Sequence, residues 1–92
     1  MSVLSPEDVE RRLRTVHGWT LSGQAIVKVF TFKDFPDAVH FVERIVPVAE
    51  GADPHPDILI NYRRVTLTYS THSAGGLTEK DFDGALAVDR LA

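Results

Sequence analysis

The sequence predicts an α+β fold, in which three helices pack on one face of a four-stranded antiparallel sheet. The order, the periodicity and the total length of its segments lead to this prediction. Segments with apolar residues at helical spacing alternate with pairs of short segments rich in β-branched residues, in the order helix, hairpin, helix, hairpin, helix. Elements in this order can bury one face of a single sheet. The length of 92 residues fits one domain, residues 1–92.

The first helix and the first hairpin occupy the N-terminal third of the chain. Ser5, followed by proline and acidic residues, is typical of a helix start, and Gly18 after His17 is typical of a helix end. Residues 19–21 and 25–32 then form two strands joined by a tight turn. In the longer strand one face carries Ile26, Phe30 and Phe32, and the other carries Val27, Val29 and Thr31. We therefore expect helices on one face and a second subunit on the other.

The second helix begins at residues 34–37 and continues with an apolar face. His40 falls off this face, and we interpret it as a surface residue. Pro47 lies inside the helix, removes one backbone hydrogen bond and crowds the carbonyl of Glu43. We therefore expect a kink near Glu43 or an early end of the helix. Either outcome would change how Glu50 approaches the following turn.

The second hairpin brings two histidines to one end of the sheet. Residues 57–62 and 64–70 are its predicted strands, so the residue that enters the first strand and the residue that leaves the second become neighbours. His55 stands before the first strand and His72 stands after the second. Imidazoles titrate near neutral pH and suit proton transfer. They are flanked by three acidic residues, Glu50, Asp57 and Asp81. The pattern predicts a metal-free acid/base pocket.

A flexible connection, residues 73–77, leads to the last helix. Thr78 followed by Asp81 forms a capping box, in which the aspartate bonds back to the start of the helix. Asp81 can therefore cap the helix and still face the pocket. Gly84 weakens the helix by up to about 1 kcal/mol relative to alanine, so we expect packing to stabilise it.

The composition is that of an ordinary globular protein, with 43% hydrophobic and 25% charged residues. A net charge of −3 in mixed signs argues against an electrostatic grip on nucleic acid. The absence of cysteine excludes a disulfide and a thiolate zinc site. A metal site built from His55, His72 and Asp81 is chemically possible, but nothing in the sequence demands a metal. Without a recognisable secretory signal or membrane span, we expect a cytoplasmic protein.

Several stretches together resemble the pterin-4a-carbinolamine dehydratase family. They are HPDI from His55, YRRV from Tyr62, STHSAGGLT from Ser70 and the EKD that follows, with weaker similarity from the HGW segment through FKDF. The resemblance covers nearly the whole chain. It implies the same fold, association into homodimers or homotetramers, and dehydration of 4a-hydroxytetrahydropterins to quinonoid dihydropterins by histidine general acid/base catalysis. It also implies that no cofactor is needed and that an aromatic amino-acid hydroxylase acts in the same recycling of tetrahydropterin.

The resemblance also assigns site residues. The implied catalytic residues are His55, His72 and Asp81. The implied substrate-binding residues are Glu50, Asp53, Pro54, His55, Pro56, Ser70, Thr71, His72 and Ser73. The family typically carries two adjacent histidines before the proline, whereas this chain has Pro54 at the first of these positions. Because proline cannot transfer a proton, we expect a reduced activity.

The same substitution keeps an alternative function open. In this alternative the chain is a dehydratase-like binding or assembly module with weak or no activity. Relatives in the family act as a dimerisation cofactor for a transcription factor and, in some bacteria, as an assembly factor for the carbon-fixing carboxylase. An open, pterin-sized cleft between the imidazoles favours the enzyme. A cleft closed by Pro54 or by a kink at Pro47 favours the module.

Overall fold

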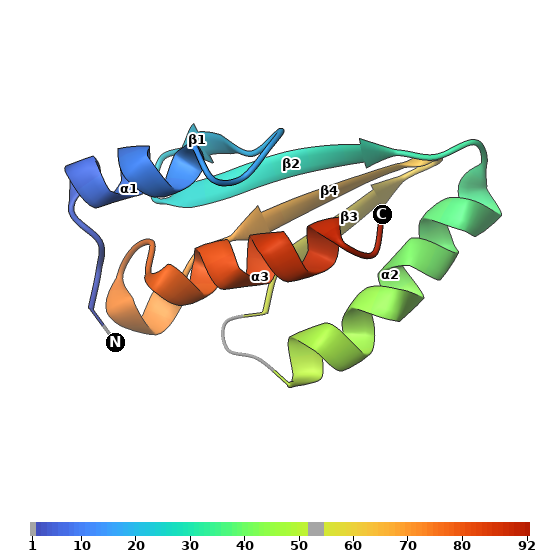
Figure 1. The fold of residues 1–92 in the computed structure, drawn as a ribbon. Helices are drawn as coiled ribbons and strands as arrows, with labels where there is room; N and C mark the ends of the chain where they lie inside the picture. Colours follow the sequence, from blue (N-terminus) through green and yellow to red (C-terminus); the bar gives the residue numbers. More distant parts are fainter. Residues whose placement is uncertain (1, 52–54) are drawn as a thin grey trace.

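The computed structural model describes residues 2–51 and 55–92, and it confirms the predicted α+β architecture. Its elements are α1 (Pro6–Leu13), β1 (Thr20–Ser22), β2 (Ala25–Thr31), α2 (Phe35–Glu50), β3 (Asp57–Asn61), β4 (Arg64–Tyr69), the short 3-10 helix η1 (His72–Ala74) and α3 (Glu79–Asp89). The four strands form one antiparallel sheet in the order β1-β2-β4-β3, and α3 lies beside β4 (Figure 1). No helix within the described residues is both long and apolar enough to cross a bilayer.

One hydrophobic core joins the three helices to one face of the sheet. The register places Ile26 of β2 opposite Tyr69 of β4, and Phe30 opposite Val65, and all four side chains are buried. The helices supply the rest of this core, chiefly Val9 from α1, Phe41 and Ile45 from α2, and Phe82, Ala85 and Val88 from α3. The opposite face of the sheet exposes large apolar side chains, among them Val29 and Leu59. The expectation of a second subunit on that face stays a prediction.

The end of α1 differs from the prediction. The helix ends at Leu13 rather than near Gly18, although Gly18 does have the predicted left-handed backbone, with φ +83°. The backbone N–H of Thr15 bonds to the carbonyl of Arg12, and the Thr15 hydroxyl donates to the same oxygen at 2.7 Å. These bonds tighten the chain into a turn and end the α-helix early.

Pro47 does not end α2, so the predicted early end is wrong. The helix continues to Glu50, and the N–H of Gly51 bonds to the carbonyl of Pro47 at 3.2 Å. Pro47 and Glu43 are both exposed, so water can satisfy the carbonyl that loses its helical partner. Glu50 is therefore the last residue of an uninterrupted α2. A kink near Glu43 stays a prediction.

Gly84 allows α3 to approach β4 closely. A Cβ atom at this position would lie 2.6 Å from Cε1 of Tyr69, well inside van der Waals contact. The Tyr69 ring is buried there and also packs against Trp19, with the ring centroids 5.9 Å apart. The residue that weakens the isolated helix is therefore the one that lets the helix pack.

We predict that Gly84→Ala destabilises the protein, although alanine favours a helix by about 1 kcal/mol. The clash with Tyr69 should outweigh this gain and lower the free energy of unfolding by about 1–2 kcal/mol, as measured by urea denaturation. Gly51→Ala is the control, because its added Cβ would make only an ordinary contact, 3.5 Å from the carbonyl of Pro47. The penalty at Gly84 should disappear in a Tyr69→Leu background. A more stable Gly84→Ala protein would contradict this account of the packing.

Candidate active site

The register of the second hairpin places the two histidine segments at one end of the sheet, as predicted. Asp57, the first residue of β3, pairs with Thr68 near the end of β4. His55 precedes Asp57 by two residues, and His72 begins η1 directly beyond the exit from β4. The segments therefore meet at the same sheet end. Joint action of the two imidazole rings stays a prediction.

His55 is tied to the end of α2 through Glu50. Its Nε2 atom lies 3.2 Å from Oε2 of Glu50, and both side chains are more than half exposed. An exposed pair of this kind contributes about 1 kcal/mol at most, because water screens it. The contact therefore orients the imidazole more than it stabilises the fold. Pro56, which follows, is buried, whereas Asp53 and Pro54 lie outside the described residues.

Asp81 is the most deeply buried charged residue of the site, with 0% exposure. Its Oδ2 atom accepts hydrogen bonds from the backbone N–H of Thr78 and from the hydroxyl of Thr71, each at 2.9 Å. The predicted capping box is therefore confirmed, and the carboxylate also grips the chain as it leaves β4. The second oxygen, Oδ1, has no hydrogen-bond partner among residues 2–51 and 55–92. Asp81 thus keeps one buried acceptor without a partner in the described chain.

The electrostatics of Asp81 connect it to His72 and Tyr69. Burial raises the pKa of the Asp81 carboxyl, while the bonds from Thr78 and Thr71 and the neighbouring imidazole of His72 act to lower it. Burial, together with the negative charge of Asp81, raises the pKa of Tyr69 to about 12. The carboxyl group therefore interacts electrostatically with an exposed imidazole and with a phenol that stays protonated at neutral pH.

The predicted substrate-binding residues of the β4 exit divide into two groups. His72 and Ser73 are exposed in η1, so their side chains are free to meet a ligand. The Ser70 hydroxyl instead donates a hydrogen bond to the carbonyl of Gln24 at 2.9 Å. The buried Thr71 hydroxyl donates to the carboxylate of Asp81. The hydroxyls of Ser70 and Thr71 thus hold the turn in place, and contact of either residue with substrate stays a prediction.

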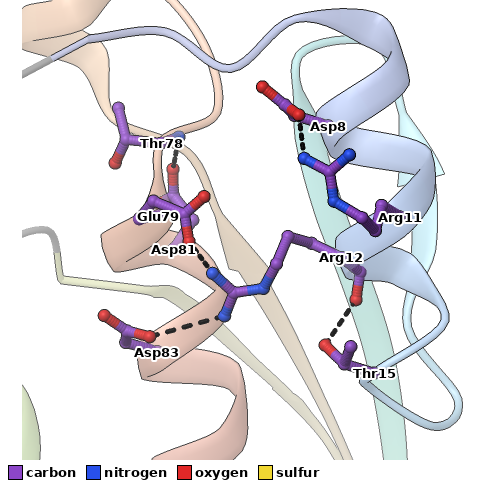
Figure 2. Close-up of polar contacts among 8 residues, drawn as sticks. All are labelled: Asp8, Arg11, Arg12, Thr15, Thr78, Glu79, Asp81 and Asp83. Atoms are coloured by element: carbon purple, nitrogen blue, oxygen red, sulfur yellow. Dashed lines mark hydrogen bonds and ion pairs between the residues drawn. The ribbon is translucent and has the colours of Figure 1, made fainter.

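Arg12 of α1 fixes the first turn of α3, which carries Asp81. Its guanidinium group binds the carboxylates of Glu79 and Asp83, four residues apart on one side of the helix (Figure 2). It also lies over the ring of Phe82, 5.2 Å from the centroid. The sequence analysis did not identify this clamp, although an arginine and two acids at helical spacing are its visible signal.

A metal site was the third possibility. In the described parts of the chain, no three side chains of histidine, cysteine, aspartate or glutamate gather closely enough to hold an ion. Asp81 and Thr71 are joined by a hydrogen bond, and the imidazole of His72 acts electrostatically on the same carboxyl group. This set can orient an imidazole and move protons.

We predict that Asp81 makes stability depend on pH in a defined direction. Because its pKa is raised on folding, its contribution is complete below the ordinary value of 3.8 and is lost as pH rises through the raised folded-state pKa. Asp81→Asn removes this titration. As pH rises from about 3 to about 7, the free energy of unfolding of the wild type should therefore fall relative to that of the variant. Urea titrations at a series of pH values measure this difference. Parallel curves for the two proteins would contradict the raised pKa.

Comparisons with known proteins identify the family. Residues 2–91 match the family model described as "Pterin 4 alpha carbinolamine dehydratase". A protein from Roseiflexus sp. (strain RS-1) is 48% identical over 88 residues, which cover 96% of this chain and 95% of the relative. One from Sulfolobus acidocaldarius is 42% identical over 88 residues, which cover 96% and 97%. Both carry the name "Putative pterin-4-alpha-carbinolamine dehydratase".

A solved structure extends the similarity to three dimensions. The crystal structure described as a transcriptional coactivator/pterin dehydratase from Brucella melitensis superimposes with a TM-score of 0.93. It is 35% identical in sequence, and the match covers 99% of each chain. Sequence, fold and family model thus agree over almost every residue, and the chain belongs to the pterin 4 alpha carbinolamine dehydratase family.

Proposed function

We propose that this chain dehydrates 4a-hydroxytetrahydropterins to quinonoid dihydropterins, with histidines as general acid and general base. Membership of the family supports the substrate class and the reaction. One observation carries the residue assignment: His72 is exposed, and its imidazole acts electrostatically on the buried carboxyl group of Asp81. His55 belongs to the same end of the sheet.

The reaction needs two proton transfers and no redox step. The lone pair on N5 expels the hydroxyl group from C4a, an acid protonates the departing oxygen, and a base removes the proton from N5. One water leaves, and the proton given by the acid is balanced by the proton taken by the base. Groups that titrate near neutral pH can do both, and each transfer is worth about 10²–10⁴-fold in rate.

The two imidazoles have different supports. The imidazole of His72 acts electrostatically on the buried carboxyl group of Asp81, which hydrogen bonds from Thr71 and Thr78 hold in place. His55 is supported by the exposed carboxylate of Glu50. We assign the more demanding transfer, protonation of the leaving oxygen, to His72, and removal of the N5 proton to His55.

Pro54 sets the expected level of activity. Where the family motif has a further histidine, this chain has a side chain that cannot exchange protons. We therefore propose an enzyme slower than relatives with the full set of histidines. By the same family analogy, it works as a homo-oligomer, and it recycles the tetrahydropterin that an aromatic amino-acid hydroxylase uses.

The second candidate is a binding module without a useful rate. Pro54 favours it, and so does the sheet face that exposes Val29 and Leu59, since exposed apolar side chains on a sheet suit contact with another protein. The name of the Brucella melitensis structure joins coactivator and dehydratase. The assay below separates the two candidates.

We predict that His72→Ala lowers the dehydration rate of 4a-hydroxytetrahydropterin by about 10²-fold and that His55→Ala has a smaller effect. Pro54→His should raise the wild-type rate by about tenfold or more, because it restores a proton-transferring group. His40→Ala, at an exposed position of α2, is the control and should match the wild type. If wild type, His55→Ala and His72→Ala all match the uncatalysed reaction, the module is the better description.

A further inference from the structure

A hollow of about 240 Å³ lies between the end of α2 and one side of α3. Its lining residues are Val48, Gly51, Tyr69, Lys80, Asp83, Gly84 and Ala87. Gly51 directly follows Glu50, and Lys80 directly precedes Asp81, so both supports of the candidate active site border it. Pockets that hold a whole small molecule usually have volumes of about 300–1,000 Å³. This hollow is smaller, so it suits part of a ligand.

Tyr69 is the buried polar residue of this hollow, and the proposed mechanism gives it no role. Its side chain is only 1% exposed, yet its hydroxyl has no hydrogen-bond partner among the described residues. A buried tyrosine hydroxyl normally has a hydrogen-bond partner. Within the described residues, the only fully enclosed side-chain polar atom without a partner is Oδ1 of Asp81, so the Tyr69 hydroxyl is still reached from the hollow that it lines. The raised pKa of about 12 keeps this group a donor.

Gly84 keeps the hydroxyl accessible. A Cβ atom at position 84 would lie 3.0 Å from the Tyr69 oxygen and less than 3 Å from two ring carbons. Any larger residue there would cover the phenol or push it aside. The pairing of tyrosine on β4 with glycine on α3 therefore places an accessible hydrogen-bond donor at the wall of the hollow.

The remaining polar groups favour a ligand substituent that carries oxygen atoms. Lys80 contributes an ammonium group that has no ion pair among the described residues, whereas Asp83 is already engaged by Arg12, 3.4 Å away. Val48 and Ala87 provide apolar surface. Two available donors, a phenol and an ammonium, match hydroxyl or carboxylate oxygens on a short chain.

We propose that this hollow is a subsite for an oxygen-rich substituent on C6 of the pterin ring, bound through the Tyr69 hydroxyl and the Lys80 ammonium group. The inference rests on the proposed function and names the part of the substrate that the histidines do not touch. It makes Tyr69 and Lys80 specificity-determining residues, and it gives a functional reason for the glycine at position 84.

Equilibrium binding of three stable pterins tests this subsite. They carry at C6 a methyl group, a dihydroxypropyl group or a carboxyl group, and binding is followed by quenching of pterin fluorescence. Tyr69→Phe should raise Kd for the dihydroxypropyl pterin by about 2-fold to 10-fold, the worth of one hydrogen bond, and leave Kd for the methyl pterin unchanged. Lys80→Met should act in the same way on the carboxyl pterin, and Lys80→Arg should restore its binding.

Tyr62→Phe is the matched control, because Tyr62 is 67% exposed in the turn at the other end of β3 and β4. It should change no Kd. If the wild type binds all three pterins and neither Tyr69→Phe nor Lys80→Met changes their relative affinities, the subsite is wrong and the proposed function stands. If the wild type binds no pterin, both are wrong.

Discussion

The buried carboxylate of Asp81 is the interaction on which the rest of this structure depends. With one oxygen it caps α3 through Thr78 and holds the exit of β4 through Thr71. Burying a carboxylate is costly unless hydrogen bonds compensate, and only one of its two oxygens is compensated within the described chain. The protein thus keeps an incompletely hydrogen-bonded carboxyl group that interacts electrostatically with His72, where the proposed chemistry can use an orienting charge.

Packing and charge, rather than helix propensity, hold α3 in place. Arg12 clamps its first turn, as described above. At its last turn, Asp89 lies at the unfavourable end of the helix dipole but receives the Lys28 ammonium group at 2.8 Å and the indole N–H of Trp19 at 3.0 Å. Between them, Gly84 rests on Tyr69. A helix fixed at both ends can present Asp81 at a constant position even though its own sequence favours a helix only weakly.

The order of elements, the strand faces and the capping box could be predicted from the sequence, because periodicity and local capping chemistry determine them. Helix ends were less predictable: Thr15 competes for a carbonyl and ends α1 early, while Pro47 is tolerated on the exposed side of α2. The tight contact between Tyr69 and Gly84 has no local signal, because it depends on how closely a helix approaches a strand far away in the chain. Candidate side chains were predicted by family resemblance, but the use of Thr71 to hold Asp81 required three-dimensional coordinates.

The central claim is that the Asp81 carboxyl group is buried and that the imidazole of His72 lowers its pKa. Carbon NMR of the Asp81 carboxyl group, titrated in the wild type and in His72→Ala, measures this most directly. The account predicts a wild-type midpoint above the ordinary value of 3.8 and a still higher midpoint in His72→Ala, because the positive imidazole that lowers the pKa is removed. A wild-type midpoint at or below the ordinary value, or one that His72→Ala leaves unchanged, would contradict it.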